Sequence, residues 1–211
     1  MFPAPLTFLA FGLIALGMVL TPGPNMIYII SRSITQGPRA GLISLGGVAL
    51  GFLLYMFSAA LGITALVMAV PFAYSALKFA GAAYLAFLAW QALKPGGQSP
   101  FVVKSLPVDR PAKLFAMGFL TNALNPKVAV LYLSLLPQFV DQHRGHVLAQ
   151  SLSLGALQIA VSLTVNAMVA VAAGSIAAFL AARPTWAKAQ RWLMGCVLGG
   201  LAVRMAVERA R

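Results

Sequence analysis

The sequence consists of long apolar runs separated by short polar segments. A run of about 20 apolar residues is long enough to cross the hydrocarbon core of a bilayer as a helix. The pattern therefore predicts an all-α membrane protein with about six transmembrane helices. The predicted helices cover approximately residues 5–32, 39–66, 72–93, 114–140, 146–180 and 186–207.

Prolines interrupt two of these helices. The first helix contains Thr-Pro-Gly-Pro-Asn at residues 21–25, and the fourth contains Asn-Pro-Lys at residues 125–127. A proline lacks the N–H donor of a helical residue, and its ring clashes with the preceding turn. We therefore expect both helices to be broken there. The alternative interpretation is a proline kink that only shapes the packing of the helix.

The two halves of the chain are organised alike. Each begins with a broken helix, continues with a long helix and ends with a shorter one. Because each half has an odd number of spans, the second half enters the membrane from the opposite face. We predict one transporter domain, residues 1–211, built from two inverted three-helix repeats, a design common among secondary transporters. The repeats cover about residues 1–94 and 114–211, joined by a linker at about 95–113.

Composition and charge support a membrane protein. Hydrophobic residues make up 61% of the chain and charged residues only 9%, whereas soluble domains carry about 25% charged residues. The net charge of +12 comes from basic residues that lie mostly between the apolar runs. This distribution indicates membrane topology rather than nucleic-acid binding. By the positive-inside rule, loop 94–113 is predicted to be cytoplasmic and both termini periplasmic.

The two breaks are the predicted substrate site. A half-helix that begins inside a membrane turns unpaired N–H groups toward its surroundings and suits a substrate carboxylate. A lysine within a span is costly to insert and rarely idle. Lys127 is expected to bind a carboxylate or carry a proton, unless it snorkels to the membrane interface. The predicted substrate-binding residues are Pro22, Gly23, Pro24, Asn25, Asn122, Asn125, Pro126 and Lys127.

A polar stripe marks the fifth predicted helix. Gln158, Ser162 and Asn166 are spaced four residues apart and share one helix face. We predict that they line a water-filled pathway together with Tyr55. The alternatives are interhelical hydrogen bonds for the stripe and a place in an interfacial aromatic belt for Tyr55.

Residues for enzymatic or metal chemistry do not cluster in the spans. The three acidic residues fall in loops or at helix ends, both histidines flank a loop, and Cys196 is the single cysteine. The sequence has no Gly-x-Ser-x-Gly nucleophile elbow and no phosphate-binding loop. We therefore expect a protein that is not an enzyme and binds neither a metal ion nor a cofactor.

The sequence resembles the LysE/RhtB family of bacterial amino-acid exporters. The resemblance rests on Leu-Thr-Pro-Gly-Pro-Asn at residues 20–25, Leu-Asn-Pro-Lys at 124–127, Leu-Pro-Gln-Phe-Val-Asp at 136–141 and Lys-Phe-Ala-Gly-Ala-Ala-Tyr-Leu at 78–85. It implies a secondary exporter in the bacterial inner membrane, driven by the proton gradient. The RhtB-type branch, associated with neutral amino acids, homoserine and its lactone, looks closer than the basic-amino-acid branch.

The chain departs from the family at two proton acceptors. Many relatives have Asp at the position of Asn25, and many have His near Tyr55. Asp141 is the only acid left on a family motif, and it is the predicted coupling or gating residue.

We therefore predict export of a small neutral amino acid or derivative, such as threonine, homoserine or its lactone, by alternating access. One repeat would rock against its inverted copy within the lipid bilayer, with protons as the coupling ion. A homo-oligomer is compatible with the sequence. The alternative function is a passive channel or facilitator for small polar solutes, which would not move solute against its gradient.

Overall fold

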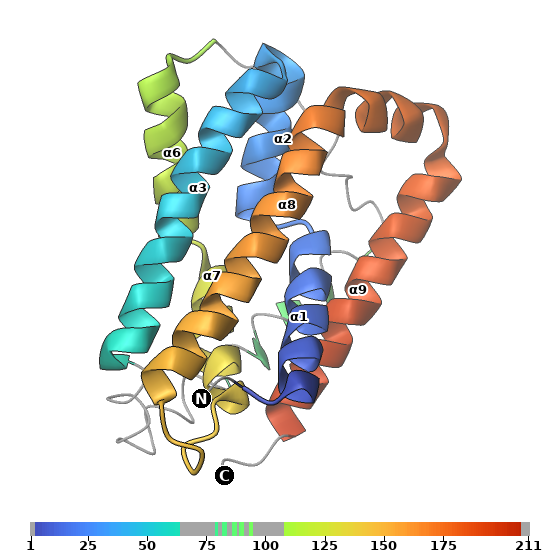
Figure 1. Cartoon of the computed structure of the whole chain (residues 1–211). Coiled ribbons are helices and arrows are strands. Elements are labelled where there is room, and N and C mark those ends of the chain that lie inside the picture. The colour runs from blue at the N-terminus through green and yellow to red at the C-terminus, as the bar shows by residue number, and fades with distance from the viewer. Residues whose placement is uncertain are drawn as a thin grey trace.

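A computed structural model describes residues 3–63, 79, 82–83, 86–87, 89–90, 93–94 and 108–207, and all regular structure among them is helical. The first part contains α1 (Pro5–Leu20), α2 (Pro24–Gln36), α3 (Pro38–Ser58) and a π-helical turn, η1 (Ala59–Ile63). The second part contains α6 (Pro111–Ala123), α7 (Pro126–Val130), a π-helical turn η2 (Leu131–Leu135), a 3₁₀ turn η3 (Leu136–Phe139), α8 (Val147–Ala182) and α9 (Pro184–Val207). Figure 1 shows this arrangement.

Most of these helices begin with a proline, including α2 at Pro24 and α7 at Pro126. Proline is well suited to the first helical position, because the N–H that it lacks would have no intrahelical partner there. The same residue type that cannot continue a helix therefore starts the next one.

The predicted interruptions are confirmed. The axes of α1 and α2 are bent by 52° relative to each other, and those of α6 and the segment Pro126–Phe139 by 47°. Each bent pair satisfies the length and hydropathy of one membrane span. The breaks are therefore changes of direction and not slight kinks.

Among the described residues, two single helices are long and apolar enough to cross a membrane, Pro38–Leu61 and Val147–Ile176. Counting each bent pair as one span brings the number to four. The predicted third helix at 72–93 and linker at 95–113 lie largely outside the described residues. Six spans and the inverted repeat therefore stay predictions.

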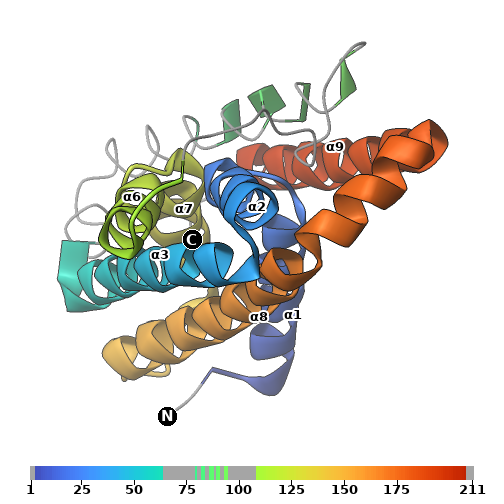
Figure 2. The same cartoon turned by 90° about the horizontal axis from the view of Figure 1, so that it is seen from above.

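Helix α3 lies between α6 and α8 (Figure 2). Its contact with α6 is so close that a Cβ atom on Gly47 would collide with the Phe115 carbonyl, and one on Gly118 with the Ser44 carbonyl. Small residues allow such backbone approach between membrane helices. Helices α3 and α6, which belong to different predicted repeats, are therefore in contact backbone against backbone.

The polarity of the described surface suits a lipid environment. Leu6 and Leu13 on α1 are 77% and 60% exposed, whereas a set of polar side chains is buried. Lipid tails solvate exposed leucines without cost, and buried polar groups find their partners inside the protein. The buried polar side chains include Thr21, Asn25, Asn122, Asn125, Lys127, Gln158, Ser162 and Asn166.

Candidate substrate site between the helix breaks

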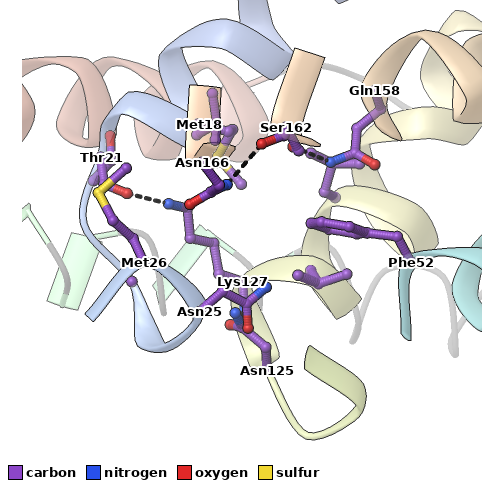
Figure 3. A pocket seen from close by; sticks show the side chains of 14 residues that line it. Met18, Thr21, Asn25, Met26, Phe52, Asn125, Lys127, Gln158, Ser162 and Asn166 are labelled. Atoms are coloured by element: carbon purple, nitrogen blue, oxygen red, sulfur yellow. Dashed lines mark hydrogen bonds between the residues drawn. The ribbon is translucent and has the colours of Figure 1, made fainter. Parts of the chain in front are cut away.

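Both breaks face one cavity of about 40 Å³ (Figure 3). A water molecule needs about 10–15 Å³ on this measure, so the cavity has room for about three waters. A whole amino acid requires it to widen. Its polar lining comes from Thr21, Gly23, Asn25, Asn125, Lys127, Gln158, Ser162 and Asn166. Its apolar lining comes from Met18, Val19, Met26, Phe52, Val128 and Leu131.

The first break leaves a helix N-terminus without a cap. Gly23 stands at the N-cap of α2 and no side chain accepts a hydrogen bond from the first turn. The first N–H groups of a helix have no intrahelical partner, and their partial positive charge attracts anions. Gly23 lines the cavity, so this end of α2 is available to an anionic group there.

Asn25 is held by a relay of hydrogen bonds. Its Nδ2 donates to Oδ1 of Asn122 at 2.6 Å, and Nδ2 of Asn122 donates to the Val48 carbonyl at 2.8 Å. Asn122 fits against α3 because Gly51 has no side chain: a Cβ there would lie 2.6 Å from Asn122 Nδ2. Asn122 therefore stands behind Asn25 and orients it, and is not itself part of the cavity lining.

The second break places a lysine against the first. Asn125 caps α7, with its Oδ1 accepting a hydrogen bond from the Lys127 N–H at 3.0 Å. The Lys127 side chain is only 8% exposed, and its Nζ donates to the Thr21 carbonyl (Figure 3). Gly23 leaves room for it, since a Cβ there would lie 3.2 Å from Lys127 Cδ. Lys127 is thus buried between the breaks and does not reach an interface.

Helix α8 supplies the opposite polar wall. Gln158 Nε2 donates to Ser162 Oγ at 2.7 Å, and Asn166 Nδ2 donates to the Ser162 carbonyl at 2.8 Å. The hydroxyl of Tyr132, from η2, donates to Gln158 Oε1 at 2.6 Å. The stripe predicted from the sequence therefore lines the cavity and makes one hydrogen bond to another helix, from Tyr132 to Gln158. The water-filled pathway stays a prediction.

No acidic side chain lines this cavity among the residues described above. Asp109 pairs with Arg32 and Lys113 at 2.8 and 2.7 Å, and Asp141 lies 4.0 Å from Arg144. Lys127 therefore brings a positive charge to a lining that is otherwise neutral. Such a lining suits a ligand with an anionic group.

Asp109, Arg32 and Lys113 form an ion-pair cluster. This cluster joins the two broken spans at the ends that lie away from the breaks. Arg32 is on α2, and Asp109 directly precedes α6. The hydrogen bond from Lys113, supported by the charge of Arg32, holds the pKa of the Asp109 carboxyl below its usual value. Asp109 therefore stays ionised and keeps α2 paired with α6 at neutral pH.

A model of the LysE type translocator family matches residues 16–209 of the chain. The chain belongs to this family. It is accordingly a membrane transporter and not an enzyme, as the sequence predicted. Proteins named leucine efflux protein from Salmonella typhimurium and Salmonella choleraesuis are each 25% identical to it over 192 residues, covering 91% of both chains. An uncharacterized membrane protein of Pseudomonas aeruginosa is 32% identical over 131 residues, or 59% of each chain. No solved structure matches.

 Four of the eight substrate-binding residues predicted at the breaks line the cavity of this LysE type translocator, namely Gly23, Asn25, Asn125 and Lys127. The other four are Pro22, Pro24, Asn122 and Pro126. The prolines among them shape the breaks, and Asn122 acts through Asn25.

Two further predicted residues lie away from the cavity lining. Tyr55 stacks on Tyr132 with 5.8 Å between ring centroids, and its hydroxyl donates to the Ala123 carbonyl at 2.9 Å. It therefore supports the wall behind Gln158 and does not face the cavity. Asp141 is half-exposed in the loop after η3, where its Oδ1 accepts a hydrogen bond from the His143 N–H at 2.9 Å.

Sequence reasoning missed Thr21 and Tyr132 as site residues. Thr21 provides its carbonyl to Lys127 because it ends α1, and carbonyls at a helix C-terminus lack intrahelical partners. Tyr132 is fully buried and orients Gln158. A tyrosine five residues after a lysine in an apolar run was the available signal for it.

Proposed function

We propose that this protein is a secondary active exporter of small neutral amino acids, and that the cavity between the breaks is its central substrate site. The observation that carries the proposal is the buried Lys127, which bridges from the second break to the Thr21 carbonyl at the first. The names of the Salmonella relatives support a neutral amino acid such as leucine.

The carboxylate of the substrate binds where the two breaks meet. Lys127 Nζ is a hydrogen-bond donor that can exchange its Thr21 partner for a carboxylate oxygen. The uncapped N-terminus of α2 adds backbone donors beside it. A carboxylate is costly to desolvate unless such partners replace its water, so both groups are needed for tight binding.

The charge of the lining sets the preference for neutral side chains. A zwitterion entering the cavity compensates Lys127 with its carboxylate and leaves one ammonium to be solvated by neutral oxygens. A lysine or arginine substrate brings a second cation, for which none of the described lining residues offers a counter-ion. Threonine, homoserine and homoserine-like molecules remain candidates with leucine.

Transport follows alternating access in this proposal, with protons as the coupling ion and export from the cytoplasm across the bacterial inner membrane. Because the cavity is smaller than an amino acid, it must widen toward one side at a time to admit and release the substrate. Loop 94–113 faces the cytoplasm and both termini face the periplasm. Labelling of single cysteines in that loop from outside intact cells, in a Cys196→Ser background, would contradict this orientation.

The test of the function is transport by the purified protein in proteoliposomes with an imposed proton gradient. We expect leucine or threonine to accumulate against its own gradient, and lysine flux to be lower by about tenfold or more. A protonophore should abolish the accumulation. Equal lysine flux would contradict the selectivity, and flux that only follows the solute gradient would identify a passive channel.

A further inference from the structure

We infer that the carboxamide oxygens of Asn25 and Asn166 form the subsite that binds the substrate's primary ammonium group. The inference rests on the proposed function and deepens it, because it assigns the second charged group of the amino acid to named atoms. The two residues come from α2 and α8, line the same cavity as Lys127, and are 7% and 3% exposed.

Hydrogen bonds determine which end of the Asn25 side chain is free. The Val48 carbonyl can only accept, so it fixes Nδ2 of Asn122 toward α3 and turns Asn122 Oδ1 toward Asn25. That oxygen accepts from Asn25 Nδ2 at 2.6 Å. The Oδ1 atom of Asn25 is then left buried without a hydrogen-bond partner among the described residues.

A backbone carbonyl likewise fixes the orientation of the Asn166 amide. Its Nδ2 donates to the Ser162 carbonyl one turn earlier on α8, and a carbonyl cannot donate in return. Its Oδ1 is also buried without a hydrogen-bond partner in the described part of the chain. Both amides thus direct an N–H to the protein and leave their oxygen unused at one cavity.

Buried acceptors without a partner are rare in folded proteins and call for a ligand or water. A primary ammonium group has three donors and no acceptor, so it matches two acceptor oxygens and rejects donors. Asn125, the other asparagine of the breaks, cannot serve in the same way, since its Oδ1 already caps α7. With Lys127 for the carboxylate, the cavity then offers a complementary group to each charge of a zwitterion.

The test compares leucine with 4-methylpentanoate, which has the same carboxylate and side chain but no amine. Binding of radiolabelled leucine to the purified full-length protein is measured with both compounds as competitors. We expect Asn25→Leu and Asn166→Leu each to weaken leucine binding by about tenfold or more. The affinity for 4-methylpentanoate should stay near that of the unchanged protein. Thr164→Leu, on the exposed side of α8, is the matched control. It should change neither the affinity for leucine nor that for 4-methylpentanoate.

An Asn166→Asp variant distinguishes loss of the ammonium subsite from loss of binding through misfolding. A carboxylate of the same size supplies a counter-ion for cations, so lysine binding should increase relative to leucine binding. Equal weakening of both competitors by the leucine variants, or unchanged leucine binding, would overturn the ammonium subsite and place only water at these oxygens. An unchanged protein that neither binds nor transports any neutral amino acid would instead overturn the proposed function itself.

Discussion

The two helix breaks have the same local backbone sequence but differ in their N-caps. In each, an extended residue is followed by a proline at the first helical position: Gly23 before Pro24, and Asn125 before Pro126. The second break is capped by the Asn125 side chain, whereas the first has no side chain to cap it. One break therefore offers a backbone N-terminus to the cavity, and the other has its first turn satisfied internally.

The position of each residue relative to the proline also decides which side chains line the cavity. Asn25 and Lys127 both follow the proline and hold the second position of their half-helices. Both line the cavity. The order of residues explains this: an asparagine before proline becomes the cap, whereas an asparagine after proline lies in the first turn with its side chain available. The two similar motifs thus present different side chains to the cavity, the neutral Asn25 from the first break and the charged Lys127 from the second.

The largest effect is expected from removing the charge at the second break. Lys127→Met should weaken leucine binding by about tenfold to one-hundredfold, because a carboxylate would lose its charged hydrogen-bond donor. Competition binding with the purified protein measures this. Lys113→Met, which removes an exposed lysine paired with Asp109, is the control. Leucine binding that survives in Lys127→Met would show that the uncapped α2 N-terminus suffices without the lysine.

A smaller loss is expected from disturbing the relay behind the first break. In Gly51→Ala, the new Cβ would meet Asn122 Nδ2 at 2.6 Å and Asn122 Cβ at 2.7 Å. The displaced Asn122 would release Asn25, so leucine binding should fall by about tenfold. Gly46→Ala is matched to it, since that Cβ would only make an ordinary contact with Phe115 at 3.4 Å. Competition binding with the purified protein measures both variants. Equal leucine binding by the two would show that the relay through Asn122 does not contribute to substrate binding.

The smallest effect on binding is expected at the cap of the second break. Asn125→Ala should cost about 1 kcal/mol of stability through the lost N-cap, and thermal unfolding in detergent measures it. Leucine binding should change less than in Asn25→Leu, because Asn125 has no unused acceptor. Asn125→Ser keeps a capping oxygen and should restore much of the stability. A larger binding loss at Asn125 than at Asn25 would reverse the roles assigned to the two breaks.

The sequence by itself determined the membrane environment, the positions of the described helices and both breaks. These features are local: hydropathy is a property of a run of residues, and proline acts on its own turn. Residues 21–25 and 125–127 were therefore identified without any knowledge of the packing. The family resemblance was confirmed by the match over residues 16–209. The four-residue spacing of Gln158, Ser162 and Asn166 likewise placed them correctly on one face.

Only the tertiary structure decided which of these groups meet and which stay unused. Lys127 reaches Thr21 across 106 positions of sequence, and Asn25 meets Asn122 across 97. Such pairings depend on how α3 packs against α6 through Gly47, and no local pattern encodes that geometry. The sequence supplied asparagines and a lysine at two breaks. Helix packing made Asn125 the cap of α7 and placed Asn122 behind Asn25 as its hydrogen-bond acceptor. The oxygen of Asn25 was left unused at the cavity, because each amide bonds to the groups that its neighbours leave unpaired.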